Sequence, residues 1–365
     1  MRPMTAAAQS APADRRAIPL ARRAFPLAVI LVLVAALLIA AAIAASIGAA
    51  KISLGRIAAA LFAGAGDPLV VNRDQIILMT IRLPRIVMSS IVGALLAGAG
   101  AVMQGLFRNP MADPGLAGVS AGAGLAAAAA IVLGDKAAPF LMANAPFLLP
   151  VAAFGGALVT TAMLYRMATW EGRTSIATML LAGLALGALA GAGTGLLVFL
   201  ADDRQLRDIT FWMLGSVAGA TWQKIAVIAP VLVLLLASFP AVGRGLDLLA
   251  LGETEAFHIG VSVERLKRLL IVLVAAAAGA AVSVTGVIGF VGIIVPHLLR
   301  LVVGPGHRLL LPASACGGAI LLVLADTVAR TIAAPAELPI GIVTALIGAP
   351  FFLFLLLNRR SRLVA

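Results

Sequence analysis

The sequence predicts an all-α integral membrane protein with about ten transmembrane helices. Hydrophobic residues make up 62% of the 365 residues and charged residues only 12%, with a mean hydropathy of +1.11. No soluble domain has that balance, and apolar runs long enough to cross a bilayer recur along the chain. Glycine occurs 37 times and is common inside those runs. Small residues let helices approach closely in lipid, so this composition favours a tightly packed helical bundle.

The net charge of +12 does not indicate a nucleic-acid partner. Basic residues at the cytoplasmic edges of a membrane protein follow from the positive-inside rule, and no basic patch here is interleaved with aromatic residues. The single cysteine, Cys316, excludes an internal disulfide framework and a cysteine-rich metal site. Because Cys316 lies in an apolar run, we expect it to be a packing residue.

Residues 1–26 are rich in Pro, Ala and Arg and are predicted to form a disordered cytoplasmic tail. The apolar run from Leu27 to Ala50 is longer than the core of a signal peptide, so it is predicted to be an uncleaved first span. The weakly polar segment from Lys51 to Ile81 is expected to lie on the outer side, with a surface helix near Ile52 to Phe62.

The second span is predicted to run from Arg82 to about Phe107, and prolines break the turn from Arg108 to Pro114 twice. The permease domain is predicted to be a single unit over 27–358, followed by a cytoplasmic tail at 359–365. An even number of spans places both termini in the cytoplasm. The eight later spans are expected at 115–134, 147–168, 176–201, 223–241, 267–285, 286–303, 309–332 and 338–357.

The charge distribution supports this topology, with one exception. Most bases fall in the expected cytoplasmic segments, whereas the outer turns hold Asp135–Lys136 and the acidic stretch Asp202–Asp208. Arg82 and Arg85 are bases on the outer side, at the start of a span. Two explanations stay open: the arginines contact a protein partner, or they anchor phosphate headgroups.

The longest polar interruption in the second half of the chain is the loop 243–264, which continues to Arg268. Asp247 is placed where an acid suits the first turn of a helix, and Gly260 where a helix ends in the left-handed conformation. Ser262 is then expected to cap a new helix, with Glu264 in its first turn. The pattern predicts a short amphipathic helix at the membrane surface. It is either a docking element or a solvated loop.

The residues needed for catalysis are absent from the sequence. It contains no GxxxxGK[ST] motif, so the chain is not expected to bind or hydrolyse ATP, and no HExxH, GxSxG or paired carboxylates occur. The three histidines are too scattered to predict a metal site. His297 is expected to cap a helix or bond to a neighbouring helix rather than ligate a metal.

Ionisable residues are nearly absent from the interiors of the spans. Only Asp326 and Arg330 lie inside one, four residues apart with the acid first, which favours an ion pair. Ion-coupled transporters usually keep a charged residue at the bilayer midplane. The chain is therefore interpreted as an apolar passageway whose energy comes from outside itself, and the polar loop is the candidate coupling surface.

Several long motifs resemble those of the permease subunits of type II ABC importers, which carry haem, iron-siderophores and vitamin B12. The motifs occur along this chain in the same order as in that family. The resemblance extends from about Arg82 to Asn358. It rests on the following stretches: Arg82-Leu-Pro-Arg85, GALLAGAGAVMQGLFRNPMADPGLAGVSAGAG, ALGETEAFHIGVSVER, TGVIGFVGIIVPHLLRLVVGPGHR and ELPIGIVTALIGAPFFLFLL.

The resemblance implies a non-catalytic subunit of the bacterial inner membrane that forms a homodimer with the pathway at its two-fold axis. It implies two cytoplasmic subunits that bind ATP and Mg and a periplasmic binding protein. No cofactor is implied for this chain. The implied ATPase-coupling residues are Leu251, Gly252, Glu253, Glu255, Ala256, His258 and Gly260. The implied docking residues for the binding protein are Arg82, Arg85 and Arg330, and the implied cytoplasmic gate comprises Asn109, Pro110, Met111, Thr174 and Ser175.

Within the family, the stretches MQGLFRNPMADPGLAGVSAGA and ITFWMLGSVAGATW are most similar to haem permeases. A ferric siderophore or vitamin B12 is the alternative substrate, since vitamin B12 permeases share much of the first stretch. A secondary transporter or channel that works without ATP is a further alternative.

Overall fold

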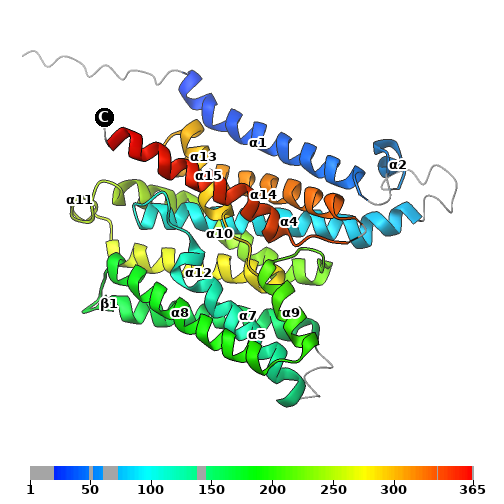
Figure 1. The fold of residues 1–365 in the computed structure, drawn as a ribbon. Helices are drawn as coiled ribbons and strands as arrows, with labels where there is room; N and C mark the ends of the chain where they lie inside the picture. The colour runs from blue at the N-terminus through cyan, green and yellow to red at the C-terminus, as the bar shows by residue number, and fades with distance from the viewer. Residues whose placement is uncertain (1–19, 49–51, 61–72, 138–144, 335, 364–365) are drawn as a thin grey trace, which may run out of the picture.

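The computed structural model describes residues 20–48, 52–60, 73–137, 145–334 and 336–363. These residues form a bundle of long helices with one short β-hairpin (Figure 1). The first helices are α1 (Leu20–Ser46), the short α2 (Leu54–Ala58) and a continuous helix Arg73–Leu106, which contains a π-helical turn η2 (Ile77–Arg82) before α4 (Leu83–Leu106).

The rest of the chain alternates long helices with short polar elements. The remaining elements are η3 (Pro114–Ala117), α5 (Val119–Ala137), α7 (Ala145–Ala168), β1 (Thr169–Trp170), β2 (Arg173–Thr174), α8 (Ile176–Leu200), α9 (Asp203–Leu214), α10 (Trp222–Leu249), α11 (Glu253–His258), α12 (Val263–Thr285), α13 (Val291–Val303), α14 (His307–Ile332) and α15 (Ile340–Leu363).

Each of the predicted spans corresponds to one apolar helix. Seven helices in the described residues are long and apolar enough to cross a membrane, and three shorter apolar helices lie within α5, α13 and α15. The all-α membrane fold predicted from composition is therefore confirmed. Helix α13 is the exception in length: its 13 residues rise only about 20 Å, and the preceding segment 286–290 is not helical.

Helix boundaries differ from the sequence-based expectations where polar residues are involved. Helix α1 begins at Leu20 rather than Leu27, and α15 continues to Leu363. Residues 1–19 of the predicted tail lie outside the described residues. The acidic stretch Asp202–Asp208 is not a simple turn, because it begins the amphipathic helix α9, where Asp202 and Gln205 form a capping box.

The centre of the bundle is α4, which is almost entirely buried. Its closest neighbour is α14, and Gly93 of α4 touches the backbone of Gly318 so closely that a Cβ on either glycine would collide with the carbonyl oxygen of the other. A Cβ on Gly100 would likewise collide with the carbonyl oxygen of Gly292 of α13. These contacts are the close helix approaches expected from the glycine-rich runs.

The two ends of the bundle carry different elements (Figure 1). The small helix α11, the β1–β2 hairpin, the start of α1 and the end of α15 lie at one end, and α2 and α9 lie at the other. Helix α10 has 28 residues and is therefore about 42 Å long, which exceeds a hydrocarbon core of roughly 30 Å. Its last turns, at the α11 end, carry the polar residues Arg244 and Asp247.

Candidate functional site

Helix α11 projects from the end of the bundle (Figure 1), and apolar side chains in and beside it are exposed. Ala256 is fully buried and holds the helix against the bundle, whereas Leu251, Phe257 and Ile259 are 63%, 68% and 60% exposed. Acidic residues Glu253 and Glu255 occupy the first turn, where they suit the helix dipole. An apolar face surrounded by charged residues beyond the ends of the spans indicates a protein contact rather than lipid.

The local prediction for the end of α11 is confirmed. Gly260 has φ +94°, the amide of Gly260 donates to Phe257 O at 2.9 Å, and the amide of Val261 donates to Ala256 O at 3.0 Å. These two bonds are those of a Schellman motif. Helix α12 then begins with Glu264 in its first turn, as expected, and Ser262 occupies its N-cap position without a side-chain capping bond.

The expected helix start at Asp247 is wrong. Asp247 lies in the last turns of α10, which ends only at Leu249. Its carboxylate Oδ1 accepts hydrogen bonds from the backbone N (2.7 Å) and ring Nδ1 (2.8 Å) of His307. Asp247 therefore does serve the positive end of a helix, but that helix is α14, sixty residues further along the chain.

Lys267 joins three elements at this end, which the sequence did not reveal. Its ammonium donates to Glu253 Oε2 at 2.7 Å, to Glu264 Oε1 at 3.1 Å and to the carbonyl oxygen of Thr174 at 3.0 Å. The residue is only 2% exposed. The positive-inside rule explains why a base occurs here, but it gives no sign that the base is buried.

The predicted gate residues Thr174 and Ser175 connect the hairpin to α8. Thr169 pairs with Thr174 in the antiparallel hairpin. The amide of Thr174 donates to Glu264 Oε2 at 3.0 Å, so the backbone of this residue is held at both N and O. Ser175 is the N-cap of α8, and its hydroxyl accepts from the amide of Thr178.

The other predicted gate segment, Asn109–Met111, forms the turn after α4. Asn109 Oδ1 accepts from the amide of Met111 at 3.0 Å. Asn109 and Pro110 line a cavity of about 430 Å³ together with Gln104, Arg108, Asp247, Arg300 and His307. This segment therefore lies beside α10 and α14, whereas Thr174 lies beside α12. A single chain places the two segments against different helices.

At the opposite end of the bundle, the predicted docking arginines are not exposed. Arg82 and Arg85 are 4% and 6% exposed, which corrects the expectation that they stand at the outer surface. Arg85 Nε lies 2.8 Å from Asp326 Oδ1, and Arg85 Nη1 lies 2.8 Å from Glu337 Oε1. Arg85 thus joins α4 to α14 through Asp326, and to the segment before α15 through Glu337.

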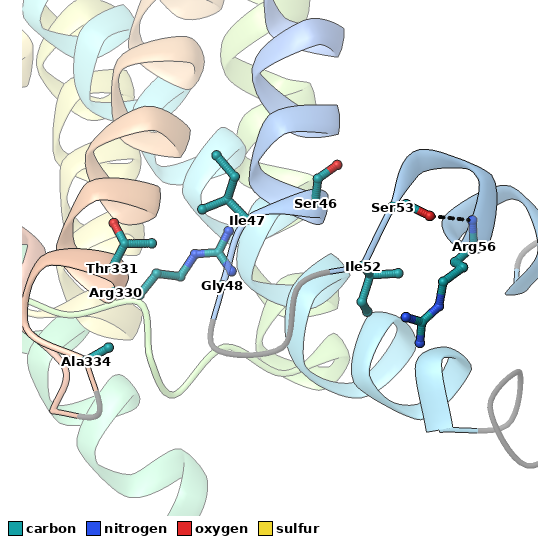
Figure 2. Close-up of a pocket in the computed structure, with 9 residues that line it drawn as sticks. All are labelled: Ser46, Ile47, Gly48, Ile52, Ser53, Arg56, Arg330, Thr331 and Ala334. Atoms are coloured by element: carbon teal, nitrogen blue, oxygen red, sulfur yellow. Dashed lines mark hydrogen bonds between the residues drawn. The ribbon is translucent and has the colours of Figure 1, made fainter.

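Arg330 also reaches Asp326, at 3.7 Å, so the pairing predicted from their spacing is confirmed. Its guanidinium additionally bonds to the carbonyl of Ala44 at the end of α1. Figure 2 shows Arg330 directed towards Ile47 and Gly48, in a cavity of about 560 Å³ that Arg56 of α2 also lines. Arg330 is therefore the docking candidate that borders an open space.

No three His, Cys, Asp or Glu side chains in the described part of the chain come together as a metal ion would require. His297 lies edge-on to Phe351 of α15 with ring centroids 6.1 Å apart, a contact between helices. Asp113, in the turn before η3, has its pKa raised to about 6 by burial.

Ten apolar helices in the described residues and a short helix with exposed apolar neighbours at one end of the bundle are features of a membrane transport protein. The profile of the FecCD transport family matches residues 33–358. The chain belongs to the FecCD transport family. Its resemblance to this family, stated above from the motifs, is thereby confirmed.

Several curated members are similar over most of their length. The hemin transport system permease protein of Yersinia pestis is 41% identical over 288 residues, covering 78% of this chain and 84% of the relative. The cobalamin import system permease protein of Halobacterium salinarum is 46% identical over 288 residues, covering 79% of this chain and 75% of the relative. The vitamin B12 import system permease protein of Salmonella typhi is 42% identical over 289 residues, covering 78% of this chain and 85% of the relative.

A solved ABC transporter described as metal-chelate type, in an inward-facing conformation, has the same fold. It is 33% identical, with a TM-score of 0.79, and the match covers 90% of this chain and 98% of that one. The chain is thus the non-catalytic permease subunit of an ABC importer, and ATP hydrolysis belongs to a separate subunit.

Proposed function

We propose that this permease imports haem from a periplasmic binding protein into the cytoplasm, as a homodimer driven by two ATPase subunits. The observation that carries the proposal is the uncovered apolar face of α11. Leu251, Phe257 and Ile259 are exposed beyond the spans, beside the acids of the first turn. A partner that buries this face gains hydrophobic contact that neither water nor lipid supplies there.

The α11 end is the cytoplasmic end in this proposal. Positive-inside counting supports it, because Arg166, Arg173, Arg244, Arg265 and Arg268 are concentrated there. Both ends of the described chain lie at the same end as α11, so the termini are cytoplasmic and the bacterial inner membrane is the expected location. ATP and Mg are bound by the partner, and this chain binds neither.

The binding protein is assigned to the α2 and α9 end, with Arg82, Arg85 and Arg330 as the docking charges. Their burial limits how they act. Arg85 is already held by Asp326 and Glu337, and Glu337 is half exposed. A carboxylate of the binding protein would therefore compete with Glu337 for Arg85, and it would reach Arg330 through the adjoining cavity.

A second copy of the chain completes the pathway. Large apolar side chains of α8 are exposed along its length, including Leu181, Leu184 and Leu189. We place the two-fold axis where the gate segments, Asn109–Met111 and Thr174–Ser175, approach their counterparts in the other copy. One chain alone keeps these segments apart.

Haem is the proposed substrate because the motifs most resemble haem permeases and a hemin permease is 41% identical to the chain. Cobalamin is the second candidate, since a cobalamin permease is 46% identical. A ferric siderophore is the third. All three are flat or bulky chelates that require a wide apolar path rather than a charged ion site.

Reconstitution with the cognate ATPase distinguishes these substrates. We expect binding protein loaded with haem to stimulate ATP hydrolysis and uptake in proteoliposomes more than the same protein offered cobalamin or a ferric siderophore. The control is substrate-free binding protein, which sets the unstimulated rate. Greater stimulation by cobalamin than by haem would contradict the haem assignment and leave the importer assignment intact.

A further inference from the structure

We propose that Lys267 is the positioning residue that transmits movement of α11 to the gate hairpin and α8. This inference rests on the proposed function, because it assumes that an ATPase docks on α11. It goes beyond that function by naming the side chain through which docking reaches the pathway. Lys267 is not part of the docking face, since the residue is 2% exposed.

The geometry uses every donor of the ammonium group. A lysine ammonium has three N–H donors. Here one meets the carboxylate of Glu253, one that of Glu264 and one the carbonyl of Thr174, at 2.7, 3.1 and 3.0 Å. Burial of an unpaired ammonium is costly, so the loss of one of these bonds destabilises the buried Lys267 and favours a shift of its remaining partners.

The three partners belong to three different elements, two of which, β2 and α12, are also joined by the bond from the amide of Thr174 to Glu264. Glu253 is the first residue of α11, Thr174 is the last residue of β2, and Glu264 is in the first turn of α12. Thr174 is followed directly by Ser175, the N-cap of α8. Lys267 therefore connects the docking helix to the beginning of a membrane helix through a single nitrogen atom.

A partner can reach the two acids that bind Lys267, although it cannot reach Lys267 itself. The side chains of Glu253 and Glu264 are 38% and 30% exposed, whereas that of Lys267 is 2% exposed. Both acids line a groove of about 610 Å³ together with Arg173 of the hairpin and Phe257 of α11. A subunit that enters this groove contacts the acids directly and can shift Glu253 relative to Lys267.

A purely structural clamp would not need charges. Well-packed apolar residues of similar volume are often as stabilising as a buried ion pair. An ion pair whose acids face a docking groove can be loosened and re-formed as the partner moves. When the partner displaces Glu253, the ammonium of Lys267 shifts and its bond to the carbonyl of Thr174 weakens. The start of α8, which follows Thr174, is then free to move.

The test uses the complete importer in proteoliposomes, with assembly, ATP hydrolysis and uptake measured on the same preparation. Lys267→Met keeps the length of the side chain and removes the donors. We expect it to assemble with the ATPase and to hydrolyse ATP, while uptake per ATP hydrolysed falls by about tenfold, within the range common for coupling between sites. Lys267→Arg should recover part of this ratio.

The matched control is Arg268→Met, which removes the same charge from the next residue of α12. Arg268 is exposed, and its Nε donates to Tyr165 Oη at 3.2 Å, on α7 rather than on α11 or the hairpin. Its ratio of uptake to hydrolysis should equal that of the wild type. If Lys267→Met does not fold, Glu253→Gln keeps the volume at Glu253 and removes its charge, and a smaller fall in the same ratio is expected.

The ratio distinguishes a positioning role from a structural one. A structural role would lower the amount of assembled importer and leave uptake per ATP unchanged, and that result in either variant would overturn the proposal. A wild-type importer that shows no ATP-dependent uptake would overturn the proposed function, and the link with it.

Discussion

Phe257→Asp on α11 is expected to abolish copurification of the permease with its ATPase and ATP-driven uptake. Phe257 is 68% exposed and lies on the six-residue helix α11, which follows α10. Exposed aromatic residues at the centre of an interface commonly cost about 2–4 kcal/mol when removed, and a buried unpaired carboxylate adds to that loss. The permease itself should fold normally, because the side chain is mostly exposed and meets the neighbouring His258 ring edge-on.

Two controls accompany this variant. Phe257→Leu keeps an apolar side chain and should retain most of the assembly. Phe211→Asp makes the same change on α9, where the side chain is 58% exposed at the opposite end of the bundle, and should not affect copurification. Normal copurification of Phe257→Asp would contradict docking on α11 and favour the interpretation of 243–264 as a solvated loop.

Gly93→Leu is expected to prevent folding of the bundle. A side chain at this position would meet the carbonyl of Gly318, which is backbone and cannot move aside as a flexible side chain can. Overpacking of an ordered core typically costs about 1–3 kcal/mol, and more when the obstacle is rigid backbone. The measurement is the yield of monodisperse protein in detergent and its thermal unfolding midpoint.

Gly155→Leu on α7 is the matched control, because nothing lies within 4 Å of a Cβ placed there. We expect its yield to match that of the wild type. An equal yield for Gly93→Leu would show that α4 and α14 can separate at little cost, contrary to the packing that places α4 at the centre.

The features that the sequence predicted correctly are those that local chemistry determines. Hydropathy belongs to each run of residues, so the spans could be placed without knowing how they pack. The end of α11 could be predicted from Gly260, because glycine adopts a positive φ at a helix end without steric cost. The φ of Gly260 is +94°. Asp326 and Arg330 are neighbours on one helix, so their pairing could be predicted from a spacing of four.

The features that could not be predicted depend on partners distant in sequence. Lys267 meets Thr174, which lies 93 residues away, and Arg85 meets Asp326, which lies 241 residues away. An acid suits a helix start, which predicts a new helix at Asp247, yet the helix whose first residue Asp247 binds begins at His307. Charge counting places a base on one side of the membrane, but only packing decides whether that base is buried.

The energy source is the central claim, and uptake into proteoliposomes tests it most directly. The buried carboxylate of Asp326 is held by Arg85 and Arg330, so it does not offer a free proton carrier. We expect uptake to require ATP and Mg on the side where α11 lies and to persist when the proton gradient is collapsed. Uptake that follows an imposed pH gradient in the absence of nucleotide would contradict the account and identify a secondary transporter.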